Sequence, residues 1–222
     1  MGRTGNYGTL FHNCETLCHM TPARRDHRAT RHRTASADVR RLIVEAAVKV
    51  LDEDGPEALT VRGVADVAGV SPTGVYNHLG GKDGVLSALF AMGFDELHDA
   101  IEGIDLDDPL EAFVETGRRY RATALRHPGR YSLMFERTGR GWTPSVEDFT
   151  HAAAAFMSLE RRVAAGQRAG LFRDGAPTEL AQLVWSTVHG QVSLELRGML
   201  FVTDADASFE ELLALITAGI AA

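Results

Sequence analysis

The sequence has few cysteines and no long apolar run. Its two cysteines, Cys14 and Cys18, both lie in the N-terminal tail, so a disulfide framework is not supported. With His19 they form only half of a zinc-binding pattern, and we predict no metal site. No apolar stretch approaches the roughly 20 residues that cross a bilayer, and no secretory signal opens the chain. We therefore expect a cytoplasmic protein without a membrane partner.

Patterns that indicate catalysis are missing as well. The histidines are scattered along the chain, and no Ser-His-Asp order stands out. The glycine-rich segment GGKDG, residues 80–84, lacks the spacing of a phosphate-binding loop. We predict that the protein has no catalytic residues and no cofactor.

Negative charge dominates the whole chain but not its beginning. The net charge is −7, yet residues 1–41 hold eight arginines and three acids, whereas residues 91–222 hold 12 arginines and 20 acids. An acidic total does not exclude binding to nucleic acid, because a local basic patch meets the phosphates. We predict a disordered basic arm over residues 1–35, either a solvated tail or an arm that contacts phosphate. Met20 is a candidate native start within it.

The remaining pattern is helical throughout and predicts an all-α protein. Apolar residues recur at helical spacing from Ala37 to Asp52, and Gly55 and Pro56 follow as stop signals. No alternating strand pattern and no internal repeat occurs. The predicted helices cover residues 37–52, 60–68, 71–79, 83–103, 108–126, 128–137, 145–170, 177–200 and 207–220. We predict a DNA-binding domain at 36–82 and a helical bundle at 83–222.

The two short helices at 60–68 and 71–79 have the pattern of a helix-turn-helix. Ala65 permits close crossing of the two helices, and Gly69 supplies the left-handed turn between them. Val64, Val70 and Val75 would hold the pair on the first helix. The polar residues that remain face outward, as they would in a helix that lies in the major groove of DNA.

This segment resembles a known family of regulators. The stretch LTVRGVADVAGVSPTGVYNHLGGKDGVL, within a match from Ala37 to Leu89, is similar to the helix-turn-helix of TetR-family transcriptional regulators. HPGRYSLMF and VWSTVHGQVSLELRG resemble the TetR C-terminal domains named for a Trp-His-Gly signature, with Trp185 four residues before His189. Two departures are Gly63, where the family often has an acid, and Leu79, where it usually has phenylalanine.

The resemblance implies a fold and a function. A three-helix DNA-binding domain with the helix-turn-helix would precede a helical-bundle domain that binds a small ligand and dimerises. The protein would be a ligand-responsive regulator, most simply a repressor that binds a palindromic double-stranded operator as a homodimer and leaves it when a small hydrophobic effector binds. A DNA-binding activator or a ligand-independent regulator stays open as an alternative.

The resemblance also implies roles for individual residues. Those expected at the DNA are Thr60, Arg62, Ser71, Thr73, Gly74, Tyr76, Asn77, His78 and Lys82. Those expected in the ligand pocket are Phe113, Tyr120, Tyr131, Met134, Phe135, Phe149, Phe156, Trp185 and His189. Taken singly, each of these pocket residues is better explained as part of the core, whereas the set as a whole fits an apolar pocket with a few polar groups. Those expected at the dimer interface are Gly190, Leu194, Gly198, Leu212, Leu215 and Ile216.

Overall fold

The computed structural model describes residues 27–135 and 141–222, so residues 1–26 of the arm predicted at residues 1–35 lie outside the described residues. The chain divides into two units, residues 1–35 and 36–222. Helix α1 runs from His27 to Asp54 and therefore begins ten residues earlier than Ala37, the start predicted from the apolar pattern. The end of the predicted disordered arm, residues 27–35, is helical instead.

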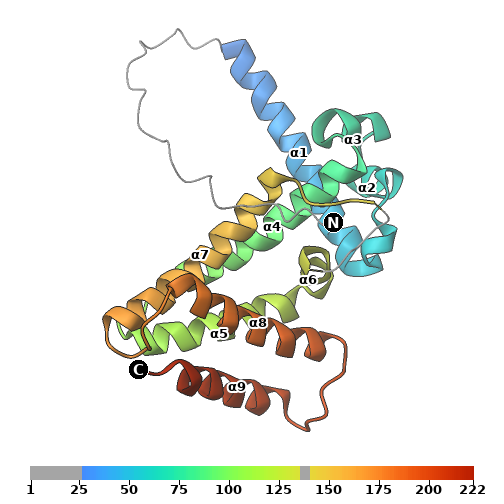
Figure 1. Ribbon diagram of the computed structural model, residues 1–222. Helices are drawn as coiled ribbons and strands as arrows, with labels where there is room; N and C mark the ends of the chain where they lie inside the picture. Colours follow the sequence, from blue (N-terminus) through green and yellow to red (C-terminus); the bar gives the residue numbers. More distant parts are fainter. Residues whose placement is uncertain (1–26, 136–140) are drawn as a thin grey trace, which may run out of the picture. The chain divides into compact units, whose positions relative to one another are not determined.

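The described part of the second unit is built from helices (Figure 1). After α1 and a short 3-10 turn at Pro56–Ala58 come α2 (Val61–Ala68), α3 (Pro72–Leu79), α4 (Lys82–Glu102), α5 (Pro109–Arg126), α6 (Pro128–Phe135), α7 (Val146–Arg168), α8 (Pro177–Leu196) and α9 (Ala205–Ile220). Each starts within two residues of its predicted start. The clearest difference is the end of α8, at Leu196 rather than at residue 200, because Gly198 adopts a left-handed conformation with φ +64°. No described helix is long and apolar enough to cross a membrane.

The first apolar core joins the second half of α1 to α2, α3 and the start of α4. Ile43, Ala65 and Val75 are completely buried in it, as the predicted stripe on the first helix requires. Leu133, from the distant helix α6, completes this core and is 1% exposed. Side chains from beyond the three-helix domain therefore help to close its core, and Trp142 packs against it as well.

The second core lies among α4, α5, α7, α8 and α9. Helix α7 packs along α4 (Figure 1), and phenylalanines from α4, α5 and α9 fill the space between the helices. The C-terminal residues close the bundle with two backbone bonds: Arg173 N donates to Ile220 O at 2.9 Å, and Ala222 N donates to Leu171 O at 3.1 Å.

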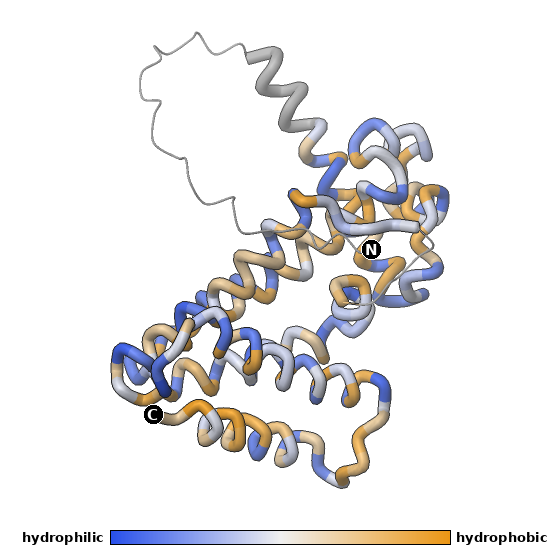
Figure 2. Tube along the Cα trace, viewed as in Figure 1, coloured by the Kyte–Doolittle hydropathy of each residue, from blue (hydrophilic) through white to orange (hydrophobic). Residues whose placement is uncertain are grey.

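Apolar side chains also remain on the outside of the last two helices. Figure 2 shows α9 as a largely apolar helix. One part of it is buried, with Phe209 only 1% exposed, but Leu215 on the same helix is 62% exposed. Leu183 and Leu194 on α8 are exposed as well. A large apolar area without cover in the described chain is typical of a surface that binds another protein.

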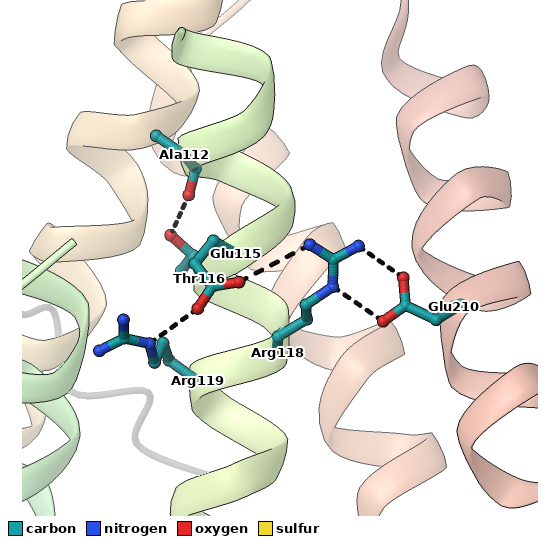
Figure 3. Close-up of polar contacts among 6 residues, drawn as sticks. All are labelled: Ala112, Glu115, Thr116, Arg118, Arg119 and Glu210. Atoms are coloured by element: carbon teal, nitrogen blue, oxygen red, sulfur yellow. Dashed lines mark hydrogen bonds and ion pairs between the residues drawn. The ribbon is translucent and has the colours of Figure 1, made fainter. Parts of the chain in front are cut away.

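Arginines of α5 bind the last two helices to the rest of the bundle. Arg118 donates from Nε and one Nη to the two carboxylate oxygens of Glu210 on α9, at 2.8 and 2.7 Å (Figure 3). Arg121 makes the same paired contact with Glu195 on α8, at 2.7 and 2.6 Å, and also reaches Asp206 on α9. Arg121 and Glu195 are mostly buried, so their pairing is less screened by water than that of Arg118.

We predict that Arg121→Met lowers the free energy of unfolding by about 3 kcal/mol, because it leaves the shielded carboxylate of Glu195 without its partner. Arg119→Met is the matched control: among the described residues Arg119 pairs only with Glu115, one turn away on its own helix, and its loss should cost no more than about 0.5 kcal/mol. Urea titration followed by circular dichroism measures both. Equal losses of unfolding free energy in the two variants would show that the Arg121–Glu195 pair stabilises the fold no more than an exposed ion pair within one helix.

Candidate functional site

The helix pair α2–α3 and the turn within it are built by three local features. Thr60 caps α2, since its Oγ1 accepts the Gly63 backbone N–H at 3.0 Å, and Ser71 Oγ accepts the Gly74 N–H at 3.1 Å in the same way on α3. Gly69, between the helices, has φ +67°, the left-handed geometry predicted for it. The start of α2 therefore forms without the second half of a capping box, which Gly63 cannot provide.

Polar side chains of α3 lie on the surface of the domain. Ser71, Thr73 and Asn77 are exposed, and Tyr76 is 59% exposed. Val75, between them, is completely buried and holds the helix on the first core. Of the other residues predicted to contact DNA, Thr60 and Arg62 are exposed. Gly74, His78 and Lys82 are half-buried. The structure thus brings the predicted residues together on and around one short helix.

His78 has a structural contact that the sequence pattern did not reveal. Its Nδ1 lies 3.3 Å from Ser36 Oγ on α1, so the imidazole holds the end of α3 against the first helix. Only the other ring nitrogen, Nε2, is left for the phosphate contact that the resemblance implies.

Two glycines let α3 and α4 approach more closely than other residues allow. Gly81 has φ +97°, and a Cβ atom there would lie 2.7 Å from the ring of Tyr76. At Gly84, on the first turn of α4, a Cβ atom would lie 1.4 Å from the carbonyl oxygen of Leu79. No substitution at Gly84 fits without movement of one helix against the other. The sequence signal for this junction is the run GGKDG, which lacks phosphate-loop spacing but has a glycine at each point of close approach.

Helix α4 belongs to both cores. Its first turns place Val85, Leu86 and Leu89 in the core of the small domain. Its later turns place Phe94 and Leu97 in the bundle, where they line an internal cavity. A shift of α4 along or about its axis would therefore change both regions.

The cavity lies inside the bundle and is almost entirely apolar. Its volume is about 40 Å³. Four of the predicted pocket residues line it: Phe113, Tyr120, Phe156 and Trp185. The sequence reasoning missed the contribution of α4 and of small residues, because these read as ordinary core positions; the further lining residues are Phe94, Leu97, Ile101, Thr116, Gly117, Ala152, Ala155, Leu159, Val184, Val188, Leu213 and Ile216.

A cluster of hydroxyl and imidazole groups borders the cavity where α5, α6 and α8 meet. The Tyr131 hydroxyl lies 2.8 Å from His189 Nδ1, and the Tyr120 hydroxyl lies 3.0 Å from the same nitrogen. The two hydroxyl groups are 3.2 Å apart. Burial, with Tyr131 close by, raises the pKa of Tyr120 far above its ordinary value, so its hydroxyl stays protonated and can donate. His189 does not line the cavity itself but fixes both tyrosines around it.

Tyr131, Met134 and Phe135 line a smaller neighbouring cavity, which shares Tyr120 and Leu97 with the larger one. They occupy α6, a short helix that connects the two cores. Gly129, at its start, packs against the backbone of Leu51 on α1, where a Cβ atom would lie 3.1 Å from the carbonyl oxygen. Met134 packs still more closely against Gly93 of α4, where a Cβ atom would lie 2.5 Å from its sulfur.

Two sequence assignments need correction, and a third residue has a second role. Phe149 does not reach either cavity; it lies on the first turn of α7, 54% exposed, with its ring against Phe90. Ile216, expected at a dimer surface, is half-buried and also lines the larger cavity, so its place at an interface stays a prediction. Gly198 lies beyond the end of α8, so it does not continue a helical spacing from Gly190.

The other residues expected at a dimer surface remain compatible with one. Leu194 and Leu215 are exposed, and Gly190 is half-buried with no atom near the place of a Cβ. Leu212 is half-buried and packs against the bundle core, so it contributes less to any outer surface.

Comparison with known proteins decides the family. Residues 43–89 match the model of bacterial regulatory proteins of the tetR family, and residues 113–216 match the tetracyclin repressor-like C-terminal domain. An HTH-type transcriptional regulator of Mycobacterium tuberculosis, Rv0681, is 30% identical over 81% of this chain and 80% of its own length. The chain belongs to the TetR family of transcriptional regulators. The Trp-His-Gly subtype stays a prediction.

Solved structures agree with this assignment at the level of the fold. A protein from Rhodococcus sp. RHA1 superimposes with a TM-score of 0.72 at 25% identity, covering 83% of this chain and 96% of that protein. The TetR-family regulator PfmR from Thermus thermophilus gives a TM-score of 0.61 at 21% identity, covering 79% of this chain and 97% of PfmR.

We predict that Gly84→Ala destabilises the protein by about 2–3 kcal/mol, because the methyl group drives α4 away from the Leu79 carbonyl. Gly219→Ala is the matched control: it lies in α9, no atom stands within 4 Å of its Cβ position, and alanine favours helix by up to about 1 kcal/mol. Thermal unfolding compares the two. An unchanged midpoint for Gly84→Ala would contradict the close contact between α3 and α4.

Proposed function

We propose that this TetR-family regulator is a repressor in the cytoplasm that binds a palindromic operator as a homodimer and is released by a small apolar effector. The observation that carries the proposal is the course of α4. Its first residues lie against the exposed helix α3, and its later residues line the buried cavity. One rigid element therefore links a surface suited to DNA with an interior suited to a small molecule.

In this proposal α3 enters the major groove. Ser71, Thr73 and Gly74, at its N-terminal end, approach the base edges, as in other helix-turn-helix proteins. Tyr76 donates from its hydroxyl to a backbone phosphate, and Lys82 neutralises another phosphate. Thr60, at the start of α2, contacts a DNA phosphate. Arg62 and Asn77 each reach either a phosphate or a base edge. Phosphate contacts orient the helix, and base contacts select the sequence.

The exposed apolar faces of α8 and α9 form the dimer interface in this proposal. Two helices from each subunit would pack as a four-helix contact about a twofold axis. Leu183, Leu194 and Leu215, all exposed in the single chain, would be covered there. The twofold axis then places two copies of α3 on half-sites about one helical turn apart.

Effector binding changes the protein because the cavity in this structure is small. About 40 Å³ is well below the roughly 150 Å³ of an apolar cavity that accepts benzene. An effector must therefore select a conformation in which the cavity walls have moved apart, and α4 is one of those walls. The effector shifts the equilibrium only by its preference for that expanded state over the state that binds DNA.

The DNA contacts are tested by a binding-site selection. Thr73→Ala should change the preferred base at one position of each half-site, whereas Tyr76→Phe should weaken all sequences alike, because it loses a phosphate contact. Wild-type affinity should fall at least roughly 100-fold between about 50 and 200 mM salt. An altered base preference in Tyr76→Phe, or a flat salt dependence, would contradict these assignments.

The dimer interface is tested by placing a charged residue on the exposed apolar face of α9. Leu215→Glu should give a monomer that keeps its helical content but binds the operator at least roughly 100-fold more weakly, since one half-site alone is left. Leu125→Glu, the same change at a partly exposed leucine of α5, should stay dimeric. Sedimentation velocity measures the assembly. A dimer in Leu215→Glu would place the interface elsewhere.

A further inference from the structure

The smaller cavity holds an arginine whose hydrogen bonding is incomplete. It lies among α4, α5 and α6 and has a volume of about 20 Å³. Arg130 of α6, which lines it, is only 7% exposed. Its Nη1 donates to Glu96 Oε2 on α4, but its Nε–H has no hydrogen-bond partner. Among the buried side-chain nitrogen and oxygen atoms of the described residues, Arg130 Nε alone lacks a hydrogen-bond partner.

An unpaired buried N–H group is costly, by about 1–3 kcal/mol, and such groups are rare in native proteins. The charge of Arg130 is nonetheless balanced. Arg126 Nη1 lies 3.8 Å from Glu96 Oε1, and His127 Nε2 lies 3.3 Å from the same oxygen. On the other side of the ring, His127 Nδ1 lies 4.0 Å from Asp52 Oδ2 of α1. The carboxylate of Glu96 balances the charge of the buried Arg130, whereas Arg126, whose side chain is 65% exposed, is largely screened by water. Arg130 needs a hydrogen-bond acceptor rather than a counter-ion.

The larger cavity offers no comparable polar group. Thr116 and Tyr120 are the hydroxyl-bearing residues of its wall, and both already have protein partners: Thr116 Oγ1 donates to Ala112 O at 2.9 Å, and Tyr120 binds Tyr131 and His189. Leu97 and Tyr120 line both cavities and therefore stand between them. In the expanded state that the effector selects, displacement of these two side chains would let a molecule with its apolar body in the larger cavity extend a polar end toward Arg130.

We propose that the effector is a neutral, largely apolar molecule with a carbonyl oxygen, which accepts a hydrogen bond from Arg130 Nε. This inference rests on the proposed effector cavity and names the chemistry it selects. The position of Arg130 also gives the contact a route to the DNA-binding domain. Its neighbour Gly129 packs on Leu51 of α1, and Leu133, one turn later on α6, lies in the core of that domain.

Two isosteric probes test the inference on the full chain. In 2-octanone a carbonyl oxygen stands where 2-methyl-1-octene has a methylene group, so the two differ in the ability to accept a hydrogen bond. Apparent dissociation constants come from the rise of the unfolding midpoint with probe concentration, followed by circular dichroism. We expect the wild-type protein to bind the ketone at least roughly 10-fold more tightly than the alkene.

Variants of two neighbouring arginines locate the effect. Arg130→Met removes the unpaired N–H and should reduce the ketone preference to less than about twofold. Arg130→Lys should do the same while it keeps an ion pair with Glu96, so it replaces Arg130→Met if that variant does not fold. Arg126→Met is the matched control: Arg126 also approaches Glu96, but it does not line the cavity, and the preference should remain.

The outcomes separate this inference from the proposed function. If ketone and alkene stabilise the wild-type protein equally, the effector cavity stands and the carbonyl site is wrong. If octanoate, included as an anionic probe, binds more tightly than the ketone, the site selects a negative charge and the neutral carbonyl is wrong. If no probe stabilises the protein, both the cavity's role and this inference fail, while operator binding is measured independently. Equal loss of preference in Arg126→Met and Arg130→Met would also overturn the assignment.

Discussion

The closeness of α3 to α4 is the constraint on which the rest of this structure depends. The carbonyl oxygen of Leu79, at the end of α3, occupies the place that a Cβ atom would take at Gly84 in α4. The two helices therefore cannot move independently at this point. The ring of Tyr76 occupies the equivalent space over Gly81. Because packed interiors do not deform continuously, displacement of α4 must carry α3 with it. A surface of one short helix thereby becomes sensitive to the interior of a bundle.

A second connection runs through α6, and it differs in kind from the first. Helix α4 passes through both cores as one continuous rod, whereas α6 is short and contacts each core with a different face. Leu133 points into the small domain, and Tyr131 joins the polar cluster beside the cavity. Met134 packs on Gly93, so α6 also touches α4 directly. The two connections are therefore mechanically coupled, and movement in one is opposed or assisted by the other.

Much of this architecture could be read from the sequence, and the reasons are local. Helix starts followed from caps and from proline in the first turn, and Thr60, Ser71 and Gly69 adopt the geometry expected of them. Helix ends were less certain, because Gly198 stops α8 where the apolar pattern continues. The cavity was only half predicted: aromatic residues such as Phe156 and Trp185 stand out in a sequence, whereas Leu97 and Val188 are indistinguishable from any other core residue.

The errors share one cause, which is that apolar spacing tells which face of a helix is buried but not against what. Leu215 and Ile216 are adjacent and both apolar, yet one is 62% exposed and the other lines the cavity. Arg130 shows the same limit for a polar residue. Nothing in HPGRYSLMF distinguishes a buried guanidinium from a solvated one, because its environment is created by Glu96, 34 residues earlier in the chain. The local sequence builds the exposed face of α3, whereas tertiary packing alone builds the chemistry of the cavity.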